Sequence, residues 1–190
     1  MYSPGVMTIG STEMDRSIVL VGLMGVGKST VGRRLAKRLG LEFVDSDHEI
    51  EQVAGYSISE IFEKFGEPSF RDGERRVIAR LVHGDPKVIA TGGGAFMDPE
   101  TRALILKDCI AVWLDADIPL LAERVSRRDT RPLVKDRDAA AVLSELAAKR
   151  NPIYAEAHIH VRSDSAPHDD AVERIIAAIQ DRKGKATAAE

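Results

Sequence analysis

Short apolar runs recur along the chain, and each is followed by a longer stretch with a different spacing of apolar residues. The runs are rich in valine, isoleucine and leucine. The first of them is apolar at nearly every position, which is typical of a strand covered on both faces in a parallel sheet. The sequence predicts strands at SIVLVG (17–22), LEFVD (41–45), KVIAT (87–91) and CIAVWLD (109–115), with HIHV (158–161) as a candidate fifth strand.

The stretches between these runs predict helices. Apolar residues return at helical spacing after Lys28, and Gly40 is placed to end that helix. Ser57 and Glu60 form a capping-box pattern at the start of the next helical segment. Further helices are predicted around 70–81, from Asp98-Pro99, from Pro119, over 139–150 with an end near Asn151-Pro152, and over 169–179.

Strands and helices alternate from one end of the pattern to the other. This order predicts an α/β fold with a mostly parallel sheet and helices on both faces. Ligands of such sheets bind outside the carboxyl ends of the strands. Three candidate ligand-binding segments lie at the ends of predicted strands: the glycine loop after residue 21, residues 45–47, and residues 92–94.

We expect one domain over residues 17–182, preceded by a disordered leader (1–16) and followed by a polar tail (183–190). The charged stretch at 126–138 is interrupted by Pro132 and predicts a mobile lid. The leader lacks the apolar core and basic start of a signal peptide, and no stretch has the length and apolarity needed to cross a bilayer. A cytoplasmic location is therefore expected.

The composition narrows the possible partners. The net charge is −3 and aromatic residues make up 5% of the chain, so neither broad nucleic-acid binding nor base stacking is indicated. Nothing in the sequence requires a partner chain, and a monomer is expected. The single cysteine, Cys109, lies in an apolar run and is interpreted as a buried core thiol.

The segment GLMGVGKST carries the clearest chemical signal. Gly22, Gly27, Lys28 and Ser29 match the pattern G-x-x-x-x-G-K-[ST] between a predicted strand and a predicted helix. Glycines let backbone N–H groups point at an anion, and the helix N-terminus adds positive charge. Lys28 can reach the β- and γ-phosphates, and the Ser29 hydroxyl can bind Mg²⁺. A plain glycine-serine turn is the alternative, but the strand predicted before the motif and the helix predicted after it favour a nucleoside triphosphate site.

Two groups of charged residues are candidates for the acceptor side. Asp45 and Asp47 could assist Mg²⁺ and accept a hydroxyl proton, or they could cap the following helix. Arg71 could form a two-pronged bond to a carboxylate, with Glu74 nearby. Considered alone, Arg71 and Glu74 fit a charged helix face better, since Arg75, Arg76 and Arg80 are nearby.

Three more features fit the same site. Gly92, Gly93 and Gly94 follow a buried strand, which favours close approach of the backbone to a ligand over a plain turn. Arg131 in the predicted lid could offset charge on a transferring phosphoryl group, or it could be a surface arginine. Arg150 ends a predicted helix, a position that also favours a cation for purely structural reasons.

Taken together, these motifs resemble those of the shikimate kinase family. The matching segments are, in order, GLMGVGKSTVGRRLA, FVDSD, SISEIFEKFGEPSFRDGE, VIATGGGAF, RPLV and RNPIY. The glycine loop is shared by P-loop proteins in general, whereas the combination of D-S-D, F-R-x-x-E, T-G-G-G and R-P-L is specific. The resemblance spans about residues 17–180, which is nearly the whole predicted domain.

The resemblance implies a P-loop fold of the nucleoside-monophosphate-kinase type, with three α/β/α layers and five parallel strands in the order 2-3-1-4-5. It implies transfer of the ATP γ-phosphoryl group to the 3-hydroxyl of shikimate in aromatic amino-acid biosynthesis. On this resemblance, Lys28 and Arg131 act on the phosphates, and Ser29 and Asp45 support Mg²⁺. The residues expected at ATP are Gly25, Val26, Gly27, Lys28, Ser29, Thr30, Arg128, Arg131 and Pro167.

The resemblance also assigns the acceptor side. Asp47 would hold the 3-hydroxyl and act as its base. Arg71 and Arg150 would bind the shikimate carboxylate, and Glu74 would orient Arg71 or a substrate hydroxyl. The glycines at 92–94 would line the ring site with their backbone amides.

Two other functions stay open. Gluconate kinases and nucleoside monophosphate kinases would share the glycine loop and a lid, but they would not require both F-R-x-x-E and T-G-G-G. A non-catalytic nucleotide-binding module is the remote alternative, and it would have little use for Asp47 and Arg150.

Overall fold

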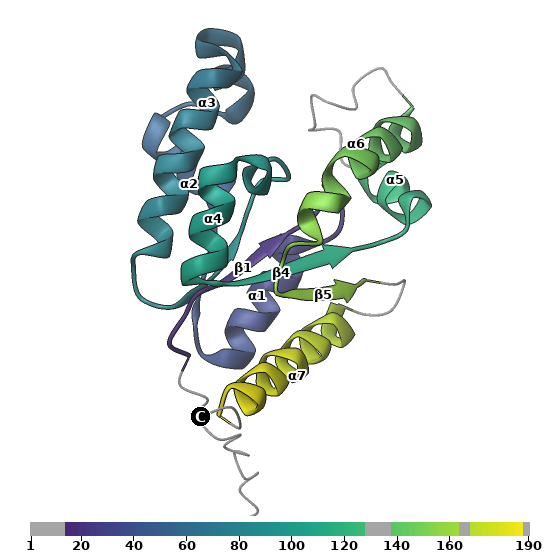
Figure 1. Ribbon diagram of the computed structural model, residues 1–190. Helices are drawn as coiled ribbons and strands as arrows, with labels where there is room; N and C mark the ends of the chain where they lie inside the picture. The colour runs from purple at the N-terminus through teal and green to yellow at the C-terminus, as the bar shows by residue number, and fades with distance from the viewer. Residues whose placement is uncertain (1–13, 128–137, 164–167, 188–190) are drawn as a thin grey trace, which may run out of the picture.

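The computed structural model describes residues 14–127, 138–163 and 168–187 and has the predicted alternation of strands and helices (Figure 1). All neighbouring strands are parallel, and their order β2-β3-β1-β4-β5 confirms the predicted topology. The strands are β1 (Ile18–Val21), β2 (Glu42–Asp45), β3 (Lys87–Ala90), β4 (Ile110–Asp115) and β5 (Ile159–Arg162).

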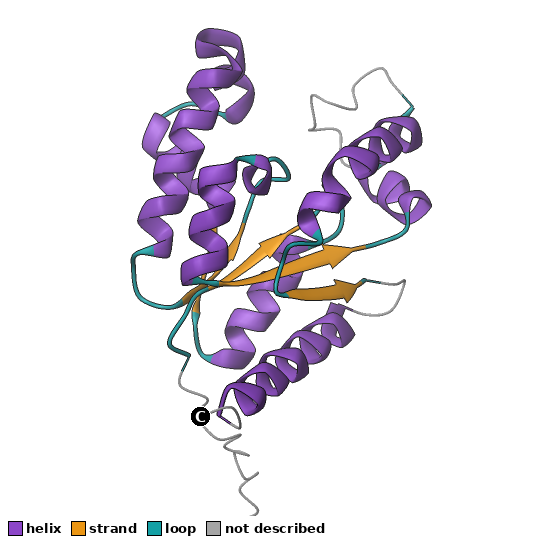
Figure 2. Cartoon of the chain, in the orientation of Figure 1, coloured by secondary structure: helices purple, strands orange, loops and turns teal. Residues whose placement is uncertain are grey.

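Helices cover both faces of this sheet, giving three layers (Figure 2). In the view of Figure 1, α1 and α7 lie below the sheet and the other helices lie above it. The helices are α1 (Lys28–Leu39), α2 (Ser46–Ala54), α3 (Ile58–Val82), the short 3₁₀ helix η1 (Ala95–Met97), α4 (Pro99–Asp108), α5 (Ile118–Ser126), α6 (Ala139–Tyr154) and α7 (His168–Thr187).

The central strand β1 explains why the sheet is parallel and buried. Ile18, Val19 and Leu20 are 0% exposed, because helices pack on both faces of β1 and strands pair on both of its edges. A strand without a solvent-facing side reads as a continuous apolar run, as the sequence predicts. The edge strand β5 instead alternates buried and exposed residues.

Several predicted helix signals are confirmed in detail. Gly40 ends α1 in the left-handed conformation with φ 68°, where glycine avoids the strain of a side chain. Ser57 and Glu60 form the complete capping box at the start of α3. The predicted break between two helical segments lies inside α3, where Gly66 has the non-helical angles φ 79° and ψ 169°.

Two helices extend beyond their predicted ends. The sequence predicts a helix end near Asn151-Pro152, but α6 continues to Tyr154, whose side chain is fully buried and anchors the last turn. Pro152 costs α6 one backbone hydrogen bond, since proline has no N–H to donate. At the other terminus, α7 continues to Thr187, into the stretch predicted as a polar tail.

The structure also bears on the predictions for Cys109, for membrane-spanning segments and for the domain limits. Cys109 is buried as predicted, and burial raises the pKa of its thiol to about 12. None of the described helices is long and apolar enough to span a membrane. Most of the predicted lid (126–138) and leader (1–16) falls outside the described residues, so the domain limits stay predictions. Met14, at the start of the described chain, is buried.

The contact between α1 and β2 generates a stability prediction. A Cβ atom on Gly32 would lie 2.5 Å from Cε2 of Phe43, so the α1 backbone can approach β2 only without a side chain there. Overpacking costs about 1–3 kcal/mol and improved helix propensity returns up to about 1 kcal/mol, so Gly32→Ala should lower the free energy of unfolding by about 1–2 kcal/mol. Urea unfolding measures this.

Gly73 in α3 is the matched control. A Cβ atom there meets no atom within 4 Å. Gly73→Ala should therefore raise the free energy of unfolding by about 0.5–1 kcal/mol, because alanine has less backbone entropy to lose in a helix. Equal stability of the two variants would show that the approach of α1 to β2 is not sterically limited.

Candidate functional site

The loop between β1 and α1 has the backbone that the glycine motif predicts. Gly22, Gly25 and Gly27 have φ values of 142°, 81° and 97°. A Cβ atom on Gly22 would lie 2.3 Å from the carbonyl oxygen of Leu114, so this position is also limited by space. The loop leads into the N-terminus of α1, whose free N–H groups favour a bound phosphate.

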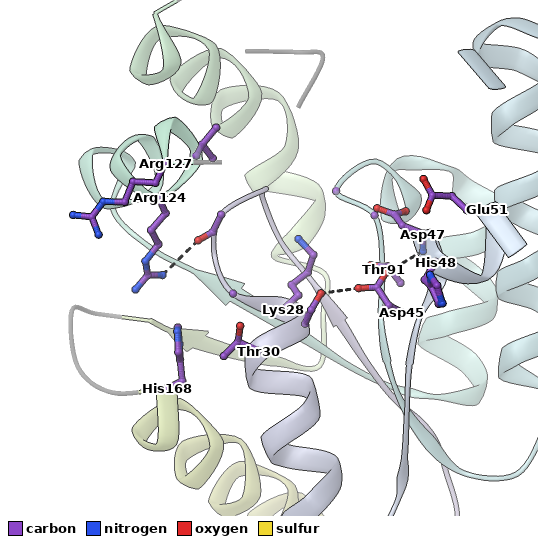
Figure 3. A pocket seen from close by; sticks show the side chains of 16 residues that line it. Lys28, Thr30, Asp45, Asp47, His48, Glu51, Thr91, Arg124, Arg127 and His168 are labelled. Atoms are coloured by element: carbon purple, nitrogen blue, oxygen red, sulfur yellow. Dashed lines mark hydrogen bonds between the residues drawn. The ribbon is translucent and has the colours of Figure 1, made fainter. Parts of the chain in front are cut away.

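The ammonium group of Lys28 is held over this loop. Its Nζ donates hydrogen bonds to the carbonyl oxygens of Gly22 at 2.8 Å and Leu23 at 3.0 Å. In Figure 3 the Lys28 side chain rises between the glycine loop on one side and Asp45 and Asp47 on the other. A positive charge at this point can interact with an anion seated in the loop.

Ser29 and Asp45, the predicted metal ligands, lie in direct contact. Ser29 Oγ donates a hydrogen bond of 2.7 Å to one carboxylate oxygen of Asp45. The other carboxylate oxygen accepts the backbone N–H of Asp47 and thereby caps α2. Asp45 therefore caps α2, one of the roles that the sequence left open, and its role at Mg²⁺ stays a prediction. Hydroxyl and carboxylate oxygens suit Mg²⁺, which usually keeps water and phosphate oxygens as its remaining ligands.

Asp47, in the first turn of α2, faces the loop that follows β3. A Cβ atom on Gly92 would lie 2.7 Å from Asp47 Oδ1 and 3.1 Å from Glu74 Oε1. The two carboxylates therefore approach the same point of the backbone from α2 and α3. Glu74 Oε1 is buried and has no hydrogen-bond partner among the described residues, so it can accept a bond from a ligand hydroxyl.

The other two glycines of the triplet face the two predicted arginines. A Cβ atom on Gly93 would lie 3.2 Å from an Arg150 Nη atom, and one on Gly94 would lie 2.6 Å from Arg71 Nη1. Each of the three glycines thus leaves room for a different charged side chain. This arrangement explains the triplet more specifically than a plain turn does.

Arg71 is oriented by acidic partners on its own helix. Its Nη1 lies 2.8 Å from Glu74 Oε2, and its Nη2 lies 3.2 Å from Glu67. Burial raises the pKa of Glu74, while the hydrogen bond from Arg71 acts to lower it. Because Glu74 is only 3% exposed, this pair is an oriented feature of the interior and not part of a solvated helix face.

A cavity of about 580 Å³ joins the glycine loop to the carboxylates. Its lining includes residues of α1, α2, α5, the loop after β3 and the start of α7. The predicted residues that line it are Gly25, Gly27, Lys28, Ser29, Thr30, Asp45, Asp47, Gly92 and Gly93. Val26 is buried within the loop. Arg71, Glu74, Gly94 and Arg150 adjoin the cavity through the contacts of the glycine triplet.

Three predicted residues cannot be placed. Arg128, Arg131 and Pro167 lie outside the described residues, so their roles stay predictions. Arg127, just before this gap, does line the cavity and forms an ion pair of 2.6 Å with Glu123.

Arg124 and His168 are among the residues of the cavity wall that were not predicted. Arg124 of α5 donates a hydrogen bond of 3.5 Å to the Gly25 carbonyl, and a Cβ atom on Gly27 would lie 3.2 Å from the His168 ring of α7. Burial lowers the pKa of His168, and the nearby arginines 124 and 34 lower it further, so its imidazole is neutral near pH 7. Arg124 lies on an ordinary amphipathic helix and His168 follows a weakly patterned segment, so neither carried a local signal.

The glycine triplet generates a prediction about ligand binding. In Gly94→Ala the new methyl group would overlap the Arg71 guanidinium and push it away from the buried Glu74 carboxylate, so the variant should also lose stability. Displaced from Glu74, Arg71 should bind the predicted carboxylate ligand, shikimate, about tenfold or more weakly, as expected for a lost charged hydrogen bond. Calorimetric titration measures this, with ADP affinity as the internal reference.

Gly73→Ala, on the same helix as Arg71 but in open space, is the control. It should leave both affinities unchanged. Normal shikimate affinity in Gly94→Ala would show that Arg71 does not need the space above Gly94.

Comparisons with known proteins agree with this geometry. The shikimate kinase family model matches residues 24–180. A shikimate kinase from Caulobacter vibrioides (strain NA1000 / CB15N) is 62% identical over 165 residues, which are 87% of this chain and 82% of that protein. A shikimate kinase from Acinetobacter baumannii, solved in complex with shikimate, is 40% identical with a TM-score of 0.85, covering 88% of this chain and 94% of that chain.

A solved gluconokinase from Sinorhizobium meliloti 1021 is also similar in structure. It is 18% identical with a TM-score of 0.59, covering 92% of this chain and 97% of that chain, and this likeness shows the fold alone. The family model and the relatives that share most of their sequence with this chain lead to one conclusion: the chain belongs to the shikimate kinase family.

Proposed function

We propose that this chain transfers the γ-phosphoryl group of ATP to the 3-hydroxyl of shikimate, a step of aromatic amino-acid biosynthesis. The products are 3-phosphoshikimate and ADP. Family membership supports this reaction, and the related Acinetobacter protein binds shikimate. The observation that carries the proposal is the glycine triplet, because it places two arginines beside the cavity that Asp47 and the phosphate-binding loop line.

The charges of the site suit the acceptor. Shikimate carries one carboxylate and three hydroxyl groups. Arg71 and Arg150 supply guanidinium groups on either side of the triplet, and such groups bind a carboxylate through two parallel hydrogen bonds. Glu74 orients Arg71 with one carboxylate oxygen. Its second oxygen has no hydrogen-bond partner among the described residues and can accept a hydrogen bond from a ring hydroxyl of shikimate.

The chemical step needs one base and compensation of negative charge. Asp47 accepts the proton of the 3-hydroxyl group while the oxygen of that hydroxyl attacks the γ-phosphorus. The bond from that phosphorus to the bridging oxygen breaks, and the electron pair leaves with ADP. Lys28 and the N–H groups of the loop stabilise the charge on the phosphate oxygens. Most of the acceleration comes from positioning, since phosphoryl transfer asks for little covalent chemistry from the protein.

Ser29 and Asp45 are the residues that would hold Mg²⁺, the serine directly and the aspartate through water. Mg²⁺ held there would supply positive charge that offsets the negative charge of the phosphates. The proposal also includes three residues at the nucleotide. Arg131 would close over the phosphates, and Arg128 and Pro167 would contact ATP. The monomeric state of this chain and its location in the cytoplasm stay predictions.

A substrate comparison tests the acceptor. We expect ADP release with ATP and Mg²⁺ only when shikimate is present, and not with gluconate or with nucleoside monophosphates. A coupled assay for ADP, with each acceptor offered separately, measures this. Equal turnover of gluconate, or none of shikimate, would remove the proposed substrate.

Asp47→Asn tests the base. Asparagine has the shape of aspartate but cannot take a proton at neutral pH, so kcat should fall about 10²–10⁴-fold, the range of general base catalysis. ADP affinity should stay within about twofold, because the loop that binds phosphates is unchanged. Asp72→Asn, an exposed carboxylate on α3 that pairs with Arg75, is the control and should keep full activity. A kcat near that of the wild type would exclude Asp47 as the base.

A further inference from the structure

Tyr154 lies behind the substrate side of the cavity and belongs to no step described above. It is the last residue of α6 and is 0% exposed. Its ring stacks on Phe96, with centroids 6.5 Å apart, and packs against Trp113, with centroids 6.1 Å apart. Because the ring is fully buried between these neighbours, the core determines where its hydroxyl oxygen lies.

Two residues of the substrate site meet at that hydroxyl. The Tyr154 hydroxyl donates a hydrogen bond to the carbonyl oxygen of Gly93. Arg150, four residues earlier and therefore on the same face of α6, interacts electrostatically with the same hydroxyl. Arg150 also borders Gly93 directly, since a Cβ atom there would lie 3.2 Å from its Nη1.

The direction of the hydrogen bond between Tyr154 and Gly93 is unambiguous. A carbonyl oxygen can only accept and a guanidinium group can only donate, whereas a tyrosine hydroxyl does both. The hydroxyl proton therefore points to the Gly93 carbonyl, and the hydroxyl oxygen is left to accept from the Arg150 guanidinium. Burial raises the pKa of Tyr154 to about 12, so the hydroxyl keeps its proton near pH 7 and the order persists.

We propose that Tyr154 is a positioning residue that fixes the Arg150 guanidinium and the Gly93 backbone relative to each other for the substrate carboxylate. Arg150 is a long side chain, and its contact with a backbone that lacks side chains does not by itself determine its rotamer. A hydroxyl held by the aromatic core supplies the missing constraint. The inference rests on the proposed function, since it concerns the carboxylate of the same acceptor.

Tyr154→Phe is the direct test, because it keeps the packed ring and removes only the hydroxyl. Losing one hydrogen bond to a charged group should raise the KM for shikimate about tenfold, while the KM for ATP stays within about twofold. Steady-state kinetics of the full chain measure both constants. An active variant with an unchanged KM for shikimate would overturn the inference.

Trp113→Phe is the packing control. It loosens the contact on the Tyr154 ring but leaves the hydroxyl in place. If the hydroxyl matters only for stability, the two variants should change melting temperature and kinetic constants in parallel. We expect instead that only Tyr154→Phe separates the KM for shikimate from the KM for ATP.

A double-mutant cycle tests whether Tyr154 acts through Arg150. In the Arg150→Ala background, Tyr154→Phe should change the KM for shikimate by less than about twofold, because residues that act together are not additive. A full tenfold effect in that background would exclude the pathway through Arg150. No turnover of shikimate by the wild type would instead overturn the proposed function and, with it, this inference.

Discussion

The site depends on the close approach of a bare backbone to four charged side chains, those of Asp47, Arg71, Glu74 and Arg150. Gly94 has φ −95°, a conformation open to any residue, so space and not backbone freedom requires glycine there. The same holds for Gly92 and Gly93, which are absent from the glycines with positive φ. The glycine loop differs, because Gly22, Gly25 and Gly27 do need left-handed angles. The two glycine clusters therefore serve different physical purposes within one cavity.

The ion pairs around the triplet contribute unequally. Arg71 pairs with Glu67, which is 62% exposed, and with Glu74, whose side chain is 4% exposed. An exposed pair contributes little, whereas removing one partner of a buried pair costs several kcal/mol. Glu74 therefore determines where Arg71 points. This orientation requires a buried carboxylate, and burial disfavours its charged form and so raises the pKa of Glu74.

Local patterns predicted the fold and much of the site, but contacts between distant segments required the structure. The loop at Gly22 to Ser29 and the capping box at Ser57 are encoded within a few residues, so both could be predicted. The glycine triplet predicted a close approach, yet nothing local indicated which side chain each glycine faces. Arg124 was missed because only the packing of α5 brings it to Gly25, ninety-nine positions away.

The nucleotide side depends on a contact between the two ends of the fold. His168 reaches the glycine loop only because α7 packs against α1 below the sheet (Figure 1). The ion pairs Arg34–Asp169 and Arg38–Glu173 join these helices, but their side chains are 43–73% exposed. Such pairs contribute at most about 1 kcal/mol each, so the buried stripe of Val172, Ile175 and Ile179 must hold α7 in place. This wall of the nucleotide cavity is thus positioned by hydrophobic packing, and His168 Nδ1 has no hydrogen-bond partner among the described residues.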